Sequence, residues 1–497
     1  MNGNHYKSKP SNEVQIFFWF IFLCVLLSAS IQWLGLPSID HDELEAVRWG
    51  ATKSWFVDKH PPLVGFIAFY WAEFTLYSNF AFFILSKLNA LLAVFIIYKL
   101  NRQFLSKHLS LIATASYTST YAYIVLMSQL DANGILHSLW PLFVIILWKS
   151  LTKDKYQYWI LLGAIGALTI LGKYQSVMLL LTALTMILSI RNFREHILNF
   201  KLWIALLVFI TLLTPHFLTY FGTNYSMTEY VLSSSKQNEY FYGRWSIITF
   251  ILNQILISLF GFYILIWTVR KNINFHDLKP KDDKALFLFF MALVLPAAPI
   301  LFSLFSGVSV LGSWGLTSWF LFPTLILYLF KGSNLKLSLK PYFFLVPSYL
   351  IIMSSIIILN NFYAIARPTS IPAAMKEIEL KWFEQIDNKP HTVITNSRPA
   401  QGMIFYSKSK PQVINSESPS QFSWLLDSNK CTDGPTLIIS EQNIKGDNFM
   451  KKMEKQIGKP KFYKLIFTKT ARHKITLTKP LEFQISGYSK PVCFKQK

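Results

Sequence analysis

Residues 14–36 read VQIFFWFIFLCVLLSASIQWLGL, an apolar run without a single charged side chain. A membrane-spanning helix needs about 20 consecutive, mostly apolar residues, so this run predicts a span close to the N-terminus. It is too long for a cleaved signal peptide, and no small-residue cleavage site follows it. We therefore expect a fold organised around helices in a lipid bilayer.

The composition extends this expectation to the whole chain. Of its 497 residues, 52% are hydrophobic and only 15% are charged, whereas soluble proteins carry about 25% charged residues. Aromatic residues reach 16%, as expected where side chains face lipid and its interfaces. Charge this sparse cannot cover the surface of a soluble protein of this size. The composition excludes a soluble enzyme, a disordered chain and a disulfide scaffold.

Ten further runs are long and apolar enough to predict spans. They cover residues 80–98, 109–127, 134–150, 157–172, 174–190, 202–220, 246–269, 285–303, 312–330 and 342–362. We predict a polytopic α-helical membrane protein with about 11 transmembrane helices in a domain of residues 1–363. No internal repeat is visible, which argues against transporters built from inverted halves.

The charge of the loops predicts the orientation of the chain. The net charge is +22, and the loops on the side of the N-terminus carry 19 Lys and Arg residues against 6 on the opposite side. Lys and Arg gather on the cytoplasmic side of membrane proteins, so the N-terminus is predicted to be cytoplasmic and the C-terminus outside. In a membrane protein this basic excess indicates orientation and anionic lipid rather than nucleic-acid binding.

Three segments are predicted to lie outside. Two are the loops 37–79 and 221–245. The third is the tail 364–497, where helical stretches (372–387, 399–406, 419–426 and 443–456) alternate with β-rich ones (391–395, 412–415, 436–440 and 463–468). Such alternation predicts a small extracytoplasmic α/β domain. Its basic last part, 445–497, either presses against anionic headgroups or forms a solvated face.

Two of the three cysteines, Cys431 and Cys493, lie in this tail. Disulfides persist outside the cytoplasm, so we expect a bridge between them; the alternative is two buried thiols.

A dense cluster of carboxylates follows the first span, where residues 39–50 read IDHDELEAVRWG. On a helix starting near Ser38, Asp42 and Glu45 share one face with Trp49. Carboxylates at a membrane interface are costly unless they are paired or used, so Asp42 and Glu43 are candidate catalytic residues. The alternative is that acidic residues favour the first turn of a helix. Asp40 and Asp42 could also hold a divalent cation, although two carboxylates are weak evidence for one.

Candidate cations lie along the same outer edge. Residues 57–63 read VDKHPPL, and the two prolines hold Lys59 and His60 in a rigid turn. Two explanations stay open for these cations. Either they form a clamp for a phosphate group, or the turn only leads the chain back into the next helix and the cationic side chains extend to the membrane interface. The candidates for the clamp are Lys59, His60, Lys87, Lys173, Tyr174 and Arg244.

Asp131, in the loop 128–134, is the third catalytic candidate. It either caps the following helix or points into the same outer cavity as Asp42.

The chain lacks several common signatures. It contains no P-loop and no GxGxxG motif after a strand, so nucleotide binding has no support. No Cys/His cluster has zinc spacing. A transporter or a lipid or glycan flippase remains the alternative class, since charged residues in spans are compatible with transport.

Taken together, these motifs resemble the bacterial branch of the protein O-mannosyltransferase and lipid A aminoarabinose transferase superfamily. These are GT-C-fold glycosyltransferases that use polyprenyl-phosphate sugars. The similar features are an acidic Asp-Glu pair after the first span, a Lys/His-Pro-Pro turn, an Asp in the second outer loop and a Gly-Lys-Tyr between two spans. Here they read Asp42-Glu43, Lys59-His60-Pro61-Pro62, Asp131 and Gly172-Lys173-Tyr174, with Ser313-Trp314, Pro323 and the outer α/β tail also similar.

The resemblance implies an inverting enzyme of the cytoplasmic (inner) membrane. Such an enzyme passes a sugar from a polyprenyl phosphate to a lipid, glycan or protein acceptor on the outer face, with an Asp as general base. Among the carboxylates, Asp42 is the expected base, because Glu43 points elsewhere on a helix and Asp40 is better explained as a helix-start residue. The chain departs from the family pattern in having both Lys59 and His60 in one turn. No further cofactor is implied.

Overall fold

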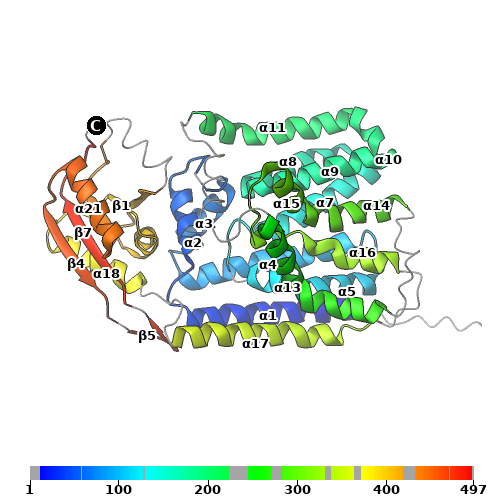
Figure 1. Cartoon of the computed structure of the whole chain (residues 1–497), viewed down its shortest axis with the longest axis horizontal. Coiled ribbons are helices and arrows are strands. Elements are labelled where there is room, and N and C mark those ends of the chain that lie inside the picture. The colour runs from blue at the N-terminus through cyan, green and yellow to red at the C-terminus, as the bar shows by residue number, and fades with distance from the viewer. Residues whose placement is uncertain are drawn as a thin grey trace, which may run out of the picture.

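The computed structural model describes residues 12–57, 59–126, 129–222, 244–270, 282–330, 337–362, 371–417, 431–469, 471–478 and 480–494. The long helices form a bundle, and a sheet domain covers one end of it (Figure 1). Helices α2 (His41–Ala51) and α3 (Leu63–Phe74) lie between these two parts.

All eleven predicted apolar runs coincide with a helix or with consecutive short helices. The single helices are α1 (Glu13–Gly35), α4 (Asn79–Asn101), α7 (Leu136–Lys153), α8 (Tyr156–Gly172), α11 (Phe200–Phe221), α13 (Arg244–Val269) and α17 (Lys340–Phe362). The composite ones are α5 (Lys107–Thr118) with α6 (Tyr121–Leu126); η1 (Tyr174–Ser176) with α9 (Val177–Ser189); α14 (Asp283–Phe289), the π-turn η6 (Phe290–Val294) and α15 (Leu295–Ser306); and η7 (Gly312–Gly315), η8 (Trp319–Leu321) and α16 (Phe322–Leu329). Two short elements, α10 (Arg191–Arg194) and η2 (Glu195–Leu198), follow α9.

Several of these helices have the length and composition of membrane spans. Among the described residues, four are long and apolar enough: α1, α4, α11 and the continuous helix Asp283–Ser306. The number rises to six if each of two bent helix pairs forms one span. Only 17% of the apolar window of α11 is buried inside the protein, so most of its side chains are available to lipid. The count of eleven spans and the orientation remain predictions.

Helices α2 and α3 pack closely because both carry glycine at their contact. A Cβ atom on Gly50 would lie 2.0 Å from the carbonyl oxygen of Gly65, which no side chain tolerates. Pro62 is the N-cap of α3, so the Pro-Pro turn ends just where that helix begins. This close contact fixes the turn that carries Lys59 against α2.

The C-terminal domain is a mixed α/β domain. It contains α18 (Ile371–Phe383), β1 (Thr392–Thr395), η9 (Pro399–Gly402), α19 (Met403–Tyr406), β2 (Gln412–Asn415), β3 (Thr436–Glu441), α21 (Ile444–Ile457), β4 (Phe462–Phe467), β5 (Ala471–His473), β6 (Thr476–Thr478) and β7 (Glu482–Tyr488). Five strands form a sheet in the order β2-β1-β3-β7-β4, in which β1 runs parallel to β2 and β3, and β7 runs antiparallel to β3 and β4.

The predicted α/β character of the tail is confirmed, with two differences. The β-rich stretches 391–395, 412–415, 436–440 and 463–468 correspond to β1–β4, and three helical stretches correspond to α18, η9–α19 and α21. The strand β7 and the hairpin β5–β6 were not predicted. The helical stretch 419–426 lies outside the described residues.

The predicted disulfide between Cys431 and Cys493 is present and joins two segments 62 residues apart, which also form an isolated β-bridge at these cysteines. The remaining cysteine, Cys24, is a buried free thiol in α1.

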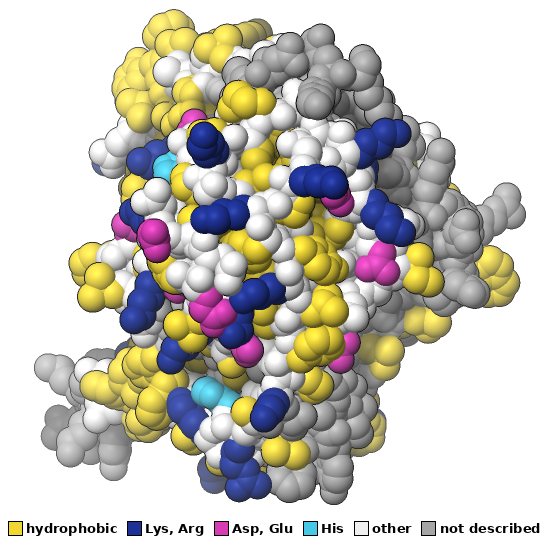
Figure 2. Space-filling model, turned by 90° about the vertical axis from the view of Figure 1, so that its left-hand side faces the viewer, with side chains coloured by type: hydrophobic (Ala, Val, Ile, Leu, Met, Phe, Trp, Pro, Cys, Tyr) yellow, Lys and Arg dark blue, Asp and Glu magenta, His cyan; other side chains and the backbone are white. Residues whose placement is uncertain are grey.

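The domain also touches the end of the first span. The hydroxyl of Thr476 in β6 donates to the carbonyl oxygen of Gly35 at 2.9 Å, and the amine of Lys474 lies over the ring of Trp33. The far end of the domain, by contrast, has Lys and Arg side chains scattered among acidic and apolar ones (Figure 2). Such a mixed surface is typical of protein that faces water.

Candidate active site

Helix α2 presents the carboxylates because a capping box fixes its start. The side chain of Asp40 accepts a hydrogen bond from the backbone of Asp42 at 2.9 Å, and the carboxylate of Glu43 accepts one from the backbone of Asp40 at 3.1 Å. The predicted helix-start role of Asp40 is confirmed. With this start, Asp42, Glu45 and Trp49 all line one cavity, as their shared helical face predicted.

Lys59 lies at the centre of the charged end of the cavity. Its amine is 2.7 Å from a carboxylate oxygen of Glu45 and 3.6 Å from one of Asp42. The same amine lies 5.9 Å from the ring centre of Trp49, a favourable cation–π position. Three residues of α2 therefore hold Lys59 against the helix.

His60 differs from the cation that the sequence suggested. Burial, together with the charges of Lys173 and Lys59, holds the pKa of His60 well below its ordinary value. Its ring packs edge-on against Trp49, with 5.5 Å between the ring centres. The lowered pKa favours the neutral imidazole of His60, which can contribute hydrogen bonds in the cavity.

Asp131 fulfils both of its expected roles, since it lines the cavity and also caps the turn before α7. Its carboxylate accepts hydrogen bonds from the backbone of Asn133 at 2.9 Å and of Gly134 at 2.6 Å, and from the Asn133 amide at 3.1 Å. Both of its oxygens are therefore already engaged.

Lys173 and its neighbours form the opposite wall. The amine of Lys173 donates to the side-chain oxygen of Asn133. The hydroxyl of Tyr174 is 3.2 Å from His216, whose other ring nitrogen is 2.6 Å from the carbonyl oxygen of Trp55. Both ring nitrogens of the buried His216 thus have a partner, and this residue fixes Tyr174 in the wall.

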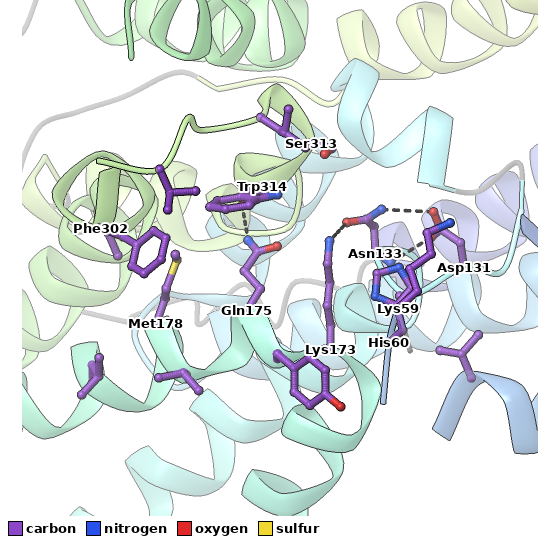
Figure 3. Close-up of a pocket in the computed structure, with 18 of the residues that line it drawn as sticks. Lys59, His60, Asp131, Asn133, Lys173, Gln175, Met178, Phe302, Ser313 and Trp314 are labelled. Carbon is purple, nitrogen blue, oxygen red and sulfur yellow. Dashed lines mark hydrogen bonds between the residues drawn. The ribbon is translucent and has the colours of Figure 1, made fainter. Parts of the chain in front are cut away.

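The cavity has a volume of about 950 Å³ and two unlike ends. In Figure 3, Lys59, His60 and Asp131 lie at one end, while Met178 and Phe302 lie at the other. Gln175 lies between them and donates to the carbonyl oxygen of Trp314. The apolar arm runs between α9 and α15, and its side chains include Val177, Met178, Leu181, Ala298, Leu301, Phe302 and Phe305. The cavity is therefore shaped for an amphipathic molecule with a charged head and a long apolar tail.

Two predicted site residues do not line this cavity. Glu43 is 2% exposed, and its carboxylate accepts a hydrogen bond at 3.1 Å from the backbone of Leu130, next to Asp131. Lys87 is 1% exposed, and its amine donates to Gln32 of α1 and to Ser86. Both side chains point between elements instead of into the site. Glu43 links α2 to the Asp131 loop, and Lys87 lies within electrostatic reach of Glu43.

Arg244 begins α13, but its side chain lies outside the described part of the chain, so its role remains a prediction. Most of the loop 221–245 is outside it as well.

Four residues of the site were missed or not given a role. Glu45 shares a helical face with Asp42, so its position was visible in the pattern, but its pairing with Lys59 was not. Asn133 and Gln175 are neutral amides beside Asp131 and Tyr174, and a neutral amide carries no motif signal of its own. Trp314 was named in the sequence analysis only because the Ser313-Trp314 pair is similar to the family pattern.

A divalent cation does not fit the residues that suggested one. The carboxylate of Asp40 is occupied by the helix cap, and Asp42 faces the amine of Lys59. Among the described residues, no group of three or more His, Cys, Asp or Glu side chains is arranged to hold a metal ion.

The bundle of apolar helices, the carboxylate-bearing helix α2 at its end and the C-terminal α/β domain together form a GT-C type of fold. Two solved structures share it over nearly the whole chain. ArnT from Cupriavidus metallidurans bound to undecaprenyl phosphate is 12% identical with a TM-score of 0.57, covering 96% of this chain and 98% of that chain. ArnT from the same organism in the apo state is 10% identical with a TM-score of 0.54, covering 95% and 98%.

Residues 59–218 match the family model of the dolichyl-phosphate-mannose-protein mannosyltransferases. No protein of curated function matches the chain. The chain thus has an ArnT-like GT-C fold, and the resemblance drawn from its motifs is confirmed. The matched segment contains Lys59, Asp131 and Lys173 but begins after Asp42, so the role of Asp42 is argued from geometry.

The buried carboxyl group of Glu43 yields a pH-dependent prediction. Burial raises its pKa from 4.5 to about 8, although the N–H groups of Leu130 and Asp40 oppose the shift. The folded protein therefore binds this proton more tightly than the unfolded chain. The resulting stability is complete below pH 4.5 and is lost as the pH rises through 8. We expect the melting temperature of the wild type to fall between pH 6 and 9, and that of Glu43→Gln to fall less.

Differential scanning fluorimetry of both proteins in the same detergent measures this difference. Asp447→Asn, which changes an acidic residue of α21 far from the site, is the control and should keep the wild-type slope. Parallel pH curves for the wild type and Glu43→Gln would show that Glu43 is charged when buried.

Proposed function

We propose that the protein is a membrane glycosyltransferase. It moves a sugar from a polyprenyl phosphate to a hydroxyl or phosphate oxygen of a lipid, glycan or protein acceptor. The observation that carries the proposal is the cavity itself, in which lysines and carboxylates at one end continue into an apolar arm between α9 and α15.

The two ends of the cavity suit the two parts of such a donor. Lys59 and Lys173 supply two amines for a phosphate group, and charge-assisted hydrogen bonds to phosphate are about twice as strong as neutral ones. The apolar arm offers a place for isoprene units that enter from the bilayer. A lipid-borne donor also agrees with the missing nucleotide motifs. The fold is that of ArnT, which has been solved with undecaprenyl phosphate.

The reaction is a single displacement at the anomeric carbon. Asp42 accepts the proton of the acceptor hydroxyl, whose oxygen forms a bond to the anomeric carbon from the side opposite the phosphate. The bond between that carbon and the phosphate oxygen breaks, and its electron pair leaves with the polyprenyl phosphate. Lys59 and Lys173 stabilise the charge that grows there, so no acid is needed. The product has the inverted configuration.

Asp42 suits the base better than Asp131 does. The side chain of Asp42 is 49% exposed, and its nearer carboxylate oxygen lies 3.6 Å from the amine of Lys59, so an acceptor hydroxyl can approach it. The oxygens of Asp131 accept three hydrogen bonds of 3.1 Å or less from its own loop. In this proposal Asp131 shapes the loop and lies opposite Lys173.

The proposal places the reaction on the outer face of the cytoplasmic membrane. The loop charges predict an outer C-terminal domain, and the disulfide in that domain suits an oxidising compartment. The cavity lies at the end of the bundle that this domain covers, beside α2.

We expect Asp42→Asn to lower the rate of sugar transfer by about 10²–10⁴-fold, because the amide keeps the size of the side chain but cannot accept the proton. Binding of undecaprenyl phosphate should change much less than the rate does, because Glu45 still holds Lys59. The assay follows sugar release from undecaprenyl-phosphate pentoses and hexoses by purified protein in detergent, where a flippase would have no activity. Asp131→Asn is expected to have a milder effect. Normal transfer by folded Asp42→Asn together with an inactive Asp131→Asn would assign the base to Asp131.

We expect Lys59→Met and Lys173→Met each to weaken the binding of undecaprenyl phosphate. The loss of one charge-assisted contact costs about 1.5–3 kcal/mol, roughly ten- to a hundredfold in affinity. Titration of purified protein with undecaprenyl phosphate measures the change. Lys201→Met, which removes a lysine paired with Asp154 at the opposite end of the bundle, is the matched control and should bind like the wild type. Unchanged affinity in both cavity variants would rule out a phosphate site between these amines.

A further inference from the structure

The C-terminal domain contacts the helix that carries the carboxylates. The hydroxyl of Tyr406 in α19 accepts a hydrogen bond from the backbone of Ile39 at 2.9 Å and donates one to Asn79 at 2.8 Å. The amide of Asn79 in turn donates to the carbonyl oxygen of Pro37 at 3.0 Å. The outer domain thereby holds the segment from which α2 starts.

A second contact reaches the middle of α2. The side-chain oxygen of Gln401 in η9 accepts a hydrogen bond from Nε of Arg48 at 3.1 Å, and the two residues are 4% and 2% exposed. A buried guanidinium is costly unless its N–H groups find acceptors. Because the group is planar, fixing Nε also fixes the direction of the two terminal nitrogens.

One of those nitrogens faces the active site. Nη2 of Arg48 is 3.7 Å from one carboxylate oxygen of Glu45, and the other oxygen of Glu45 is 2.7 Å from the amine of Lys59. Gln401 is therefore connected to Lys59 through two intermediates, Arg48 and Glu45. Each link is a hydrogen bond or an ion pair, between buried side chains at Gln401 and Arg48 and between partly buried ones at Glu45 and Lys59.

We propose that Gln401 is a positioning residue for Lys59, so that the C-terminal domain contributes to the geometry of the active site. Gln401 orients Arg48, Arg48 orients Glu45, and Glu45 holds the Lys59 amine at the charged end of the cavity. Without the Gln401 acceptor, the guanidinium turns to satisfy Nε, so that Nη2 no longer fixes the carboxylate of Glu45 that contacts Lys59. The role of Lys59 toward the donor phosphate rests on the proposed function, whereas the connection itself does not.

Two variants test the connection. Gln401→Met keeps the length of the side chain and removes the acceptor, whereas Gln401→Glu keeps an acceptor oxygen in the same place. Gln456→Met makes the same replacement in α21 of the same domain, at an amide whose oxygen has no hydrogen-bond partner among the described residues, and is the matched control.

The first measurement does not depend on the donor. Each purified full-length variant is treated with an amine-reactive acetylating reagent, and the rate of Lys59 modification is followed by mass spectrometry. We expect Gln401→Met to change this rate at least threefold, and Gln401→Glu and Gln456→Met to stay close to the wild type. Equal rates in Gln401→Met and Gln456→Met would overturn the connection.

The second measurement is kinetic. We expect Gln401→Met to raise the donor KM about five- to twentyfold, with the acceptor KM and the melting temperature close to those of Gln456→Met. In a Glu45→Gln background, Gln401→Met should have less than a twofold further effect, because the connection is already broken. Multiplying effects of the two substitutions would contradict a common path.

Two outcomes separate the possible failures. If Gln401→Met does not fold, Arg48→Lys should show the same change in the rate of Lys59 modification, because it keeps the positive charge but loses the planar guanidinium group. A changed Lys59 rate in a protein that binds no undecaprenyl phosphate would leave the positioning role intact and reject the proposed function.

Discussion

The site depends on one interaction, the amine of Lys59 held between the carboxylates of Glu45 and Asp42 at the end of an apolar bundle. A charged side chain at the end of an apolar bundle needs an oppositely charged partner, because nothing else offsets the free energy of its desolvation. The pairing explains why α2 carries so many acidic residues and why a Pro-Pro turn follows it. It also makes one end of the cavity polar while the rest remains apolar, which is the arrangement that an amphipathic donor requires.

The fold was largely predictable because its dominant signal is local. Each apolar run became a helix or a set of short helices, since a bilayer leaves no other way to satisfy the backbone. The strands β1–β4 were visible as short β-branched stretches. Strand β7 was missed although it pairs with β3 and β4, because it contains Gly487, begins with Glu482 and is flanked on both sides by a Lys-Pro pair, all of which weaken the signal for a strand. Pairing partners of that kind cannot be derived from a single stretch.

The site was predictable only in part, for a geometric reason. Asp42 and Glu45 share a helical face, so their common direction followed from the pattern. Glu43 is one residue further, about 100° around the helix, and its carboxylate became a link to the Asp131 loop instead of a lining residue. The position of Lys87 along its helix was compatible with a role in the site, but position along a helix does not tell which side a residue faces. In the structure Lys87 is buried between α1 and α4. The contact between Gln401 and Arg48 joins residues 353 positions apart, and no sequence pattern points to it.

In the proposed function, the charged end of the cavity holds a phosphate while the arm between α9 and α15 holds the attached isoprenoid. Cross-linking with a photoreactive undecaprenyl phosphate, which carries a diazirine in its isoprenoid chain, tests this arrangement when the cross-linked peptides are identified by mass spectrometry. We expect labelling of residues in the arm such as Met178, Leu181 and Phe302, and loss of the label when unmodified undecaprenyl phosphate competes. Labelling confined to the lipid-facing surface of α11, unaffected by competitor, would contradict it.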